Sequence, residues 1–197
     1  MRIISGAAKG IRLHVPRGEA VRPTGGRVRE AIFSVLGDMA GARVFDLFAG
    51  TGALGLEALS RGADAVTCVE SDPRHAAVIR KNIELVKSAH ESLQEGGTRI
   101  LRMDVRQIPV RLKKEAQTAD IIFADPPYDK NNTGTDAEDL VSDAAFAEWA
   151  RGAIIVLEHS IKTNIASVEN IRWAIQKQKT YGDTAISFLK SAAAGNE

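Results

Sequence analysis

The sequence predicts an α/β fold with a doubly wound, mostly parallel sheet, because short apolar strands alternate with helical segments along most of its length. The clearest unit begins with a strand at residues 44–48, turns at glycines 50 and 52, and continues at helical spacing over residues 54–59. A second strand at residues 65–69 and a fourth at residues 120–124 follow the same pattern. In such a sheet, ligands bind beyond the carboxyl ends of the strands.

The remaining elements follow from local signals. Two strand-like runs around a glycine-framed loop predict a small N-terminal β-hairpin, and a Pro- and Gly-rich loop then leads to a helix with Thr24 as a possible N-cap. Residues 108–115 fit either a short helix or a charged surface segment. The expected ranges are strands 2–5 and 11–15, helix 27–36, helix 73 to about 93, strand 99–103, helix 137–150, strand 153–158 and an antiparallel C-terminal hairpin of 171–176 and 185–189.

Length and composition predict one domain with a small appendage, since the chain has 197 residues of which 44% are hydrophobic. We expect an appendage at residues 1–25, the main domain at 26–190 and a tail at 191–197. The absence of a long apolar run and of a signal peptide predicts a cytoplasmic protein without a membrane segment. The one cysteine, Cys68, excludes a disulfide within the chain, and four scattered histidines predict no metal site.

Basic residues concentrate at the N-terminus, although the formal net charge of the whole chain is only +1. Residues 1–30 hold seven basic and two acidic side chains, a net charge of +5, so the remainder carries −4. This asymmetry indicates that the N-terminus meets a polyanion, while a solvated basic arm is the alternative. The basic residues are Arg2, Lys9, Arg12, Arg17, Arg22, Arg27 and Arg29.

The spacing of Gly50, Gly52 and Gly55 fits a dinucleotide-binding turn and predicts a nucleotide-like cofactor at a helix N-terminus. Glu70 ends the next strand about 20 residues later, where an acid meets the ribose hydroxyls of an adenosine cofactor. Asp104 closes a third apolar run and is suited to an adenine amine. Asp46 lies outside the dinucleotide pattern. It suits a ligand with an ammonium group, which favours S-adenosylmethionine over NAD.

The strand at residues 120–124 runs directly into Asp125-Pro126-Pro127-Tyr128. Two prolines give a stiff turn that presents the Asp125 carboxylate and the Pro126 carbonyl as acceptors, and an aromatic ring follows. Such a group suits an exocyclic amine on a flat base: two acceptors localise the amine lone pair toward an electrophile, and Tyr128 can stack on the base. A rigid surface turn is the structural alternative.

With these two motifs the chain resembles the class I S-adenosylmethionine-dependent amino-methyltransferases, which have a Rossmann-like fold. More narrowly, it resembles the bacterial small-subunit ribosomal RNA methyltransferase D family. The motifs that carry this resemblance run along the whole chain: Arg2-Ile3-Ile4-Ser5-Gly6, Arg22-Pro23-Thr24, residues 27–33, residues 48–62 and Tyr181-Gly182-Asp183-Thr184. Gly25-Gly26 departs from the polar pair expected after Thr24.

The resemblance implies transfer of a methyl group to N2 of one guanine, guanine 966, in the 16S rRNA of an assembling small subunit. We also expect a monomer. The resemblance assigns Asp125, Pro126 and Tyr128 to the target base. It also assigns Gly50, Glu70 and Asp104 to the cofactor and residues 22–29 to RNA. Together with the residues singled out above, we expect cofactor contacts at Asp46, Phe48, Gly50, Gly52, Gly55, Glu70, Ser71, Asp104 and Val105, and RNA contacts at Arg2, Lys9, Arg12, Arg22, Thr24, Arg27 and Arg29.

Other functions compete with this interpretation. The same methyl-transfer chemistry could act on a DNA adenine or a protein glutamine. An NAD-dependent oxidoreductase would explain the glycines and Glu70 but would leave residues 125–128 without a role. A third alternative is an RNA-binding assembly factor that has this fold but catalyses no reaction. If the basic N-terminus acts separately from the glycine turn, removal of residues 1–20 weakens RNA binding in a salt-dependent way and leaves cofactor affinity unchanged.

Overall fold

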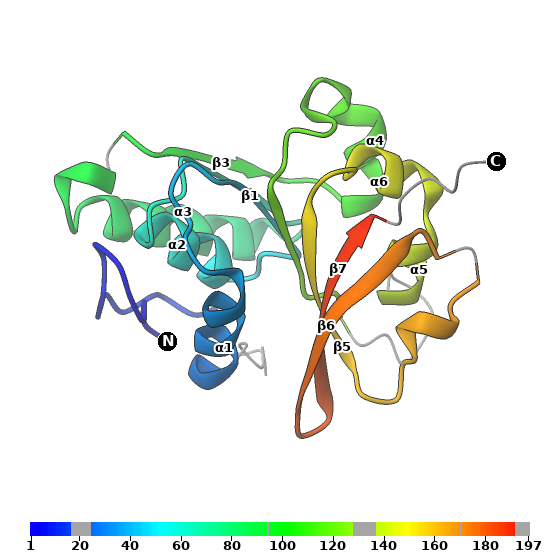
Figure 1. The fold of residues 1–197 in the computed structure, drawn as a ribbon. Helices are drawn as coiled ribbons and strands as arrows, with labels where there is room; N and C mark the ends of the chain where they lie inside the picture. The colour runs from blue at the N-terminus through cyan, green and yellow to red at the C-terminus, as the bar shows by residue number, and fades with distance from the viewer. Residues whose placement is uncertain (17–24, 94, 128–136, 170, 192–197) are drawn as a thin grey trace. The chain divides into compact units, whose positions relative to one another are not determined.

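The computed structural model describes residues 1–16, 25–93, 95–127, 137–169 and 171–191 (Figure 1). The chain divides into two compact units, residues 1–105 and 106–197. Among the described residues, the strands are mostly parallel and alternate with helices, and the last strands are antiparallel. The α/β fold class predicted from the sequence is therefore confirmed.

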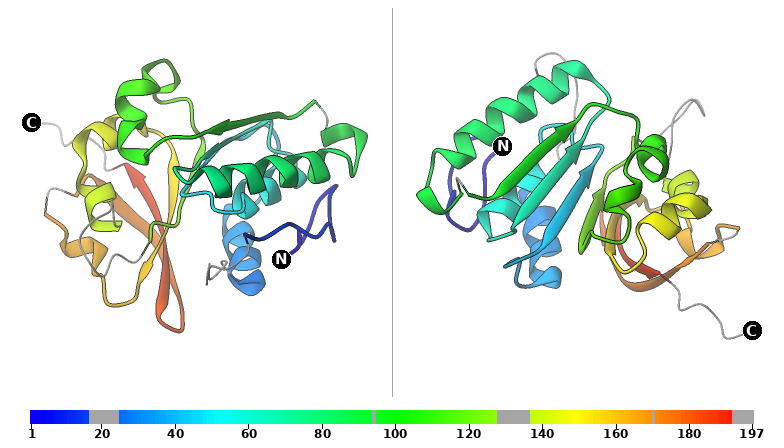
Figure 2. Two further views of the ribbon diagram at one scale, coloured as in Figure 1. Left: turned by 180° about the vertical axis from the view of Figure 1, so that it is seen from behind. Right: turned by 90° about the horizontal axis from the view of Figure 1, so that it is seen from above.

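The first unit contains a three-stranded parallel sheet in the order β3-β2-β1. Helix α2 packs against β1 and β2, and α3 packs against β3 and α2 (Figures 1 and 2). The elements are α1 (Gly26–Leu36), β1 (Arg43–Leu47), α2 (Ala53–Ser60), β2 (Ala65–Val69), α3 (Pro73–Lys87), the 3₁₀ turn η1 (Glu91–Leu93), β3 (Gly97–Leu101) and the 3₁₀ turn η2 (Val105–Gln107), which continues into the second unit.

Local signals explain where most of these elements begin. The Asp72 side chain caps α3 by accepting from Arg74 N, and Pro73 occupies the first turn, where no amide donor is needed. Helix α3 ends at Lys87, earlier than predicted, and β3 lies two residues earlier than predicted. The predicted cap of α1 is wrong, because the N-cap position is Gly25, which has no side chain.

Residues 1–16, called here the N-terminal arm, form a looser hairpin than predicted. A single antiparallel bridge joins Arg2 and Arg12, with backbone hydrogen bonds from Ile3 N to Ile11 O and from Gly10 N to Ile3 O, both 2.9 Å. Regular strands do not extend further, because the arm uses its other backbone groups to dock on α2. A Cβ at Gly6 would lie 1.8 Å from the Ser60 carbonyl oxygen, so only glycine permits this approach.

In the second unit β4 and β5 are parallel, and β7 pairs with β5 and β6 in antiparallel fashion. The predicted C-terminal hairpin is present and longer than expected. The elements are α4 (Ile108–Arg111), the 3₁₀ turn η3 (Lys113–Glu115), β4 (Ile121–Ala124), α5 (Ala137–Ser142), α6 (Ala144–Trp149), β5 (Ile154–Ser160), the 3₁₀ turn η4 (Ile165–Ser167), β6 (Trp173–Tyr181) and β7 (Thr184–Ser191).

The helix predicted over residues 137–150 is divided into α5 and α6. The Asp143 side chain accepts hydrogen bonds from Ala145 N (2.8 Å) and Phe146 N (3.1 Å), so it caps a new helix where the prediction had one continuous helix. Phe146 and Trp149 of α6 are buried, and the Trp149 indole donates to Leu112 O. The two short helices thus cover this part of the core.

Candidate functional site

Three loops of the first unit meet at one edge of its sheet. The parallel register pairs Leu47 with Val69 and Val69 with Leu101, so the carboxyl ends of β1, β2 and β3 lie side by side. Two hydrogen bonds link the residues just beyond, from Ala49 N to Val69 O (3.1 Å) and from Glu70 N to Leu101 O (3.0 Å). The turn after β1 and the acid after β2 are therefore neighbours, as the sequence predicted.

Three of the residues 48–52, called here the glycine loop, adopt left-handed backbone conformations. The φ angles are +56° at Phe48, +54° at Gly50 and +74° at Gly52, and Gly52 N donates to Ala49 O at 2.6 Å. Glycine reaches this region at no steric cost, whereas the same conformation is strained at Phe48, which has a Cβ. A Cβ on Gly50 would meet almost nothing, with Phe48 O 3.9 Å away as the one described atom in reach. The main chain at Gly50 is therefore open to a ligand.

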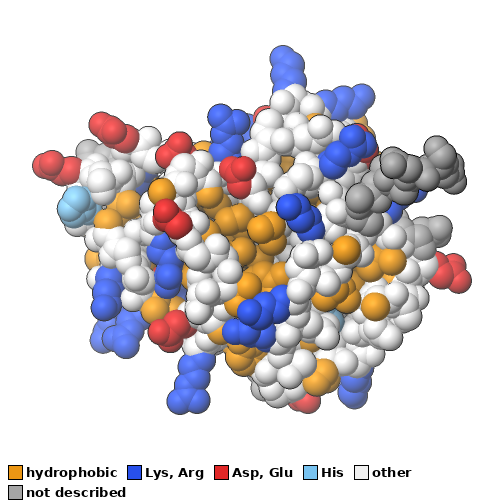
Figure 3. All heavy atoms as spheres, in the orientation of Figure 1, with side chains coloured by type: hydrophobic (Ala, Val, Ile, Leu, Met, Phe, Trp, Pro, Cys, Tyr) orange, Lys and Arg blue, Asp and Glu red, His pale blue; other side chains and the backbone are white. Residues whose placement is uncertain are grey.

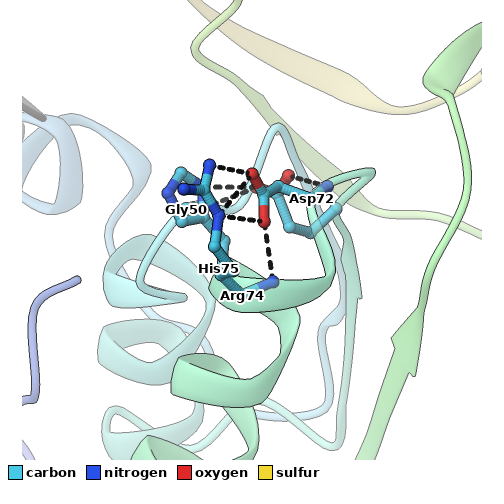
Figure 4. A network of polar contacts seen from close by, with 5 residues as sticks. Gly50, Asp72, Arg74 and His75 are labelled. Atoms are coloured by element: carbon cyan, nitrogen blue, oxygen red, sulfur yellow. Dashed lines mark hydrogen bonds and ion pairs between the residues drawn. The ribbon is translucent and has the colours of Figure 1, made fainter. Parts of the chain in front are cut away.

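Glu70 ties the glycine loop to the start of α3, in a polar network whose other members, Gly50, Asp72, Arg74 and His75, are labelled in Figure 4. Its carboxylate accepts from Gly50 N and from Asp72 N, each at 2.8 Å, and the side chain of His75 lies 3.8 Å away. Asp72 in turn accepts from Arg74, and this contact lowers the pKa of Asp72. Both Glu70 oxygens are anchored, so a carboxylate is held at a fixed position beside the open Gly50 backbone.

Asp46 lies beneath the glycine loop on β1, where it is almost fully buried. Its Oδ2 accepts from Gly55 N in the first turn of α2 at 2.9 Å. A Cβ at Gly55 would lie 2.7 Å from a Val66 methyl and 3.2 Å from Asp46 itself, so glycine is required for this close packing of helix on strand. Desolvation raises the pKa of Asp46 to about 7; nearby Glu70 adds to the increase and the Gly55 amide opposes it.

Burial of Asp46 makes the free energy of unfolding depend on pH. Its pKa is higher in the folded chain than in the unfolded chain, so the folded state holds the proton longer and loses stability as pH rises from about 4 to about 7. Between pH 5 and pH 7 this group alone costs about 2–3 kcal/mol, from about 1.4 kcal/mol per pH unit. Urea unfolding at several pH values should show a shallower decline for Asp46→Asn. Parallel curves for the two proteins would contradict the assignment.

The other predicted cofactor residues lie at the same edge of the first unit. Ser71 directly follows Glu70 and is exposed, while Asp104 is half-buried and Val105 is buried at the start of η2. Cys68 is a free, buried thiol inside β2, as the sequence predicted, and burial raises its pKa further above the ordinary value.

The predicted catalytic turn follows β4 of the second unit. All four residues of β4 are buried, and Ala124 pairs with Leu157 of β5, so Asp125 leaves the sheet at the shared carboxyl edge of two parallel strands. Asp125 is half-buried and Pro126 is buried. Tyr128 lies outside the described residues.

Three of the predicted RNA contacts lie on the surface of the N-terminal arm. Arg2, Lys9 and Arg12 are exposed, as is Arg27 at the start of α1. On the face in Figure 3, blue basic side chains lie over the arm and α1, interspersed with red acidic ones. Arg22 and Thr24 lie outside the described residues.

Arg29 was predicted to contact RNA, and this prediction is wrong. Its side chain is only 2% exposed, and one guanidinium nitrogen donates to Arg2 O at 2.8 Å. Burial lowers the pKa of Arg29, while Glu57 acts in the opposite direction. The buried face of α1 passes through Arg29, Ile32 and Phe33, so Arg29 supports the arm from beneath.

The sequence did not predict the polar groups that hold the arm. Glu57 of α2 is fully buried and accepts from Ile4 N (2.7 Å) and Ser5 N (3.0 Å), and Ser60 Oγ accepts from Ala8 N (2.9 Å). On α3, the buried Asn82 bonds to the backbone of His14. Glu57 and Asn82 each share a helix face with apolar residues, and a polar residue on such a face was the available signal. The N-terminal arm therefore docks on α2 and α3 through buried polar side chains.

Two further findings concern the described ranges only. There, no helix combines the length and apolar character needed to cross a bilayer. The same residues include no cluster of three or more His, Cys, Asp or Glu side chains able to hold a metal ion.

Comparisons with known proteins identify the family. The family model described as conserved hypothetical protein 95 matches residues 1–190. The chain is 31% identical to ribosomal RNA small subunit methyltransferase D of Escherichia coli K12, over 99% of this chain and 92% of that protein, and 33% identical to the protein of the same name from Haemophilus influenzae, over 92% and 89%. A solved structure, the putative methyltransferase yhhF from Escherichia coli, has a TM-score of 0.73 at 28% identity, covering 98% of this chain and 99% of that one. The family resemblance seen in the sequence is thus confirmed, and the chain belongs to the conserved hypothetical protein 95 family, which includes the small-subunit ribosomal RNA methyltransferases D.

Proposed function

We propose that this protein uses S-adenosylmethionine to methylate the N2 amine of one guanine in 16S rRNA, corresponding to guanine 966, within an assembling small subunit. The observation that carries the proposal is the acidic Asp125-Pro126 turn at the end of buried β4, in a chain whose first unit holds an open glycine loop flanked by Asp46 and Glu70. Relatives named as ribosomal RNA methyltransferases support the methyl donor and the class of substrate.

The residues of the first unit fit this cofactor. The open backbone at Gly50 admits a ligand, and the anchored Glu70 carboxylate has lone pairs left to accept from the two ribose hydroxyls. Asp46 would attract the ammonium group of the amino-acid part, and Asp104 would accept from the adenine amine. The remaining proposed contacts are Phe48, Gly52, Gly55, Ser71 and Val105.

When bound, the cofactor supplies a sulfonium-activated methyl group. The protein must supply a nucleophile, and an exocyclic guanine amine is a poor one because its lone pair is delocalised into the ring. The Asp125 carboxylate and the Pro126 carbonyl would accept hydrogen bonds from the two amine N–H groups and so localise the lone pair on nitrogen. After methyl transfer the nitrogen must lose one of these protons, and the carboxylate would be the group placed to accept it. The two prolines hold both acceptors in place, so little reorganisation is needed during reaction. Tyr128 is proposed to stack on the base, an interaction of about 1–3 kcal/mol.

The choice of substrate can be tested in cells. Mass spectrometry of rRNA nucleosides from a strain lacking this gene should show a loss of N2-methylguanosine that the wild-type gene restores and an Asp125→Ala gene does not. An unchanged N2-methylguanosine content would contradict the proposal. Loss of N6-methyladenosine from DNA, or of methylglutamine from a protein, would favour the alternative amines, and tight NAD binding without S-adenosylmethionine binding would favour an oxidoreductase.

The exposed basic residues of the N-terminal arm are proposed to contact RNA phosphates. We expect Lys9→Glu and Arg12→Glu to weaken RNA binding and each to reduce the slope of log K against log salt by about one, because each removes a phosphate contact and its counterion release. Fluorescence anisotropy with 16S rRNA fragments over a range of salt concentrations measures this slope.

Lys81→Glu is the matched control, because Lys81 is an exposed lysine on α3 of the same unit. An equal loss of RNA binding in this control would show that only net charge matters. Cofactor affinity should stay unchanged in all three variants.

A further inference from the structure

We propose that Asn82 is a positioning residue that couples docking of the N-terminal arm to the geometry of the glycine loop, so that the protein reaches full cofactor affinity only with the arm docked. The inference rests on the proposed position of the cofactor at this loop. It concerns a buried amide that the proposed reaction does not use. All the residues in the argument belong to the first unit.

Asn82 makes three hydrogen bonds to two segments that are far apart in the sequence. Its Oδ1 accepts from His14 N at 2.7 Å, and its Nδ2 donates to His14 O at 3.1 Å and to Thr51 O at 2.9 Å. The side chain is completely buried. One amide therefore pairs with both backbone groups of an arm residue, as a neighbouring strand would, and also holds a carbonyl of the glycine loop.

The bond to Thr51 fixes the part of the loop that a ligand meets. Because the Thr51 carbonyl points to Asn82, the amide of the same peptide points away from it, toward Ala49 O, to which Gly52 N donates at 2.6 Å. This peptide sets the turn that continues into α2 with Gly52 at φ +74°. Gly52 itself has little room, since a Cβ there would lie 3.3 Å from an Ile79 methyl.

The arm and the loop share this one amide, and that sharing is the source of the coupling. If the arm leaves, Asn82 loses two of its three partners and the amide is free to turn away from Thr51. Buried polar groups are costly without partners, so the arm-docked state favours the loop geometry with Thr51 held. A ligand that binds that geometry favours the docked arm by the same factor, because coupling between two sites is reciprocal.

The basic side chains Arg2, Lys9 and Arg12 lie exposed on this same arm. RNA bound to these side chains would shift the equilibrium between the docked and undocked arm. Through Asn82, that shift would change how firmly the glycine loop is held. The coupling thus offers a physical route by which substrate engagement and cofactor affinity influence each other in the first unit.

The test measures binding of S-adenosylhomocysteine by calorimetry to the full chain and to four variants. Asn82→Ala removes the shared amide, and His14→Pro removes the arm's donor without changing Asn82. We expect each to weaken binding about tenfold, within the range of known coupling factors of about 5 to 150. His14→Ala keeps the backbone bonds, and Lys81→Ala changes an exposed neighbour of Asn82, so both should bind as the wild type does.

Hydrogen exchange on the wild type provides a second measurement that does not depend on how the variants fold. Saturating S-adenosylhomocysteine should slow exchange of the His14 amide while exchange in β7 of the second unit stays the same. If Asn82 had only a structural role, Asn82→Ala would lower the melting temperature, but the folded variant would bind S-adenosylhomocysteine as tightly as the wild type. In the wild type, the ligand would then leave exchange of the His14 amide unchanged.

The proposal is overturned if folded Asn82→Ala or folded His14→Pro binds S-adenosylhomocysteine as tightly as the wild type. It is also overturned if S-adenosylhomocysteine does not slow hydrogen exchange of the His14 amide in the wild type. None of these measurements involves RNA or turnover. A failed coupling therefore leaves the proposed methylation standing, and a failed methylation assay leaves the coupling intact.

Discussion

Asp125→Ala is expected to reduce kcat for methyl transfer to the small subunit by about 10²- to 10³-fold, the loss typical when one preorganised hydrogen-bonding group is removed from a reaction centre. The variant loses the carboxylate that would accept from the target amine, so the amine lone pair stays delocalised. Cofactor affinity should not change, because no proposed cofactor contact lies in the second unit. Single-turnover assays with labelled S-adenosylmethionine, together with calorimetry, separate the two effects.

Two further variants sharpen this test. Asp125→Asn keeps one acceptor oxygen without the charge and should retain more activity than Asp125→Ala. Glu169→Ala removes an exposed carboxylate from the same unit and should be fully active. Wild-type turnover in a folded Asp125→Ala protein would rule out the proposed role of this turn.

Glu70→Ala should raise the Kd for S-adenosylmethionine by about 10²-fold. The estimate assumes two hydrogen bonds to the ribose at about 1.5–3 kcal/mol each for a charged acceptor, partly offset by water in the variant. The substitution also frees Gly50 N and Asp72 N, which the carboxylate now holds at 2.8 Å, so the melting temperature should fall as well. Calorimetry and thermal unfolding measure the two changes.

Glu70→Gln distinguishes the two contributions, because it retains an acceptor oxygen but loses the charge, and its affinity should lie between those of the wild type and Glu70→Ala. Glu84→Ala, an exposed acid on α3, is the control. If Glu70→Ala loses stability but binds the cofactor as the wild type does, Glu70 serves only to brace the loop.

The parts of the fold predicted correctly from the sequence are those determined by local signals. Strand β1 and the turn at Gly50 and Gly52 were predicted correctly. An apolar run and closely spaced glycines indicate a strand and a turn whatever distant parts of the chain they contact. The break between α5 and α6 also has a local cause, because Asp143 is the N-cap of α6. An aspartate before a helical run is a capping signal, but the prediction treated residues 137–150 as one continuous helix.

Three other differences from the prediction came from tertiary contacts. Strands could not extend through the N-terminal arm because Glu57 and Ser60, more than 50 residues away, bind its backbone groups. Arg29 looks like any arginine of a basic segment, and only the packing of α1 buries it under Arg2. The bridge through Asn82 was invisible for the same reason, since it depends on where the arm docks.

The most direct test of the account is methylation of purified small subunits and of free 16S rRNA with labelled S-adenosylmethionine, followed by nucleoside analysis and mapping of the labelled base. We expect the label to appear as N2-methylguanosine at a single guanine of 16S rRNA. Label in another nucleoside, or no transfer to either substrate by a folded protein that binds the cofactor, would contradict it.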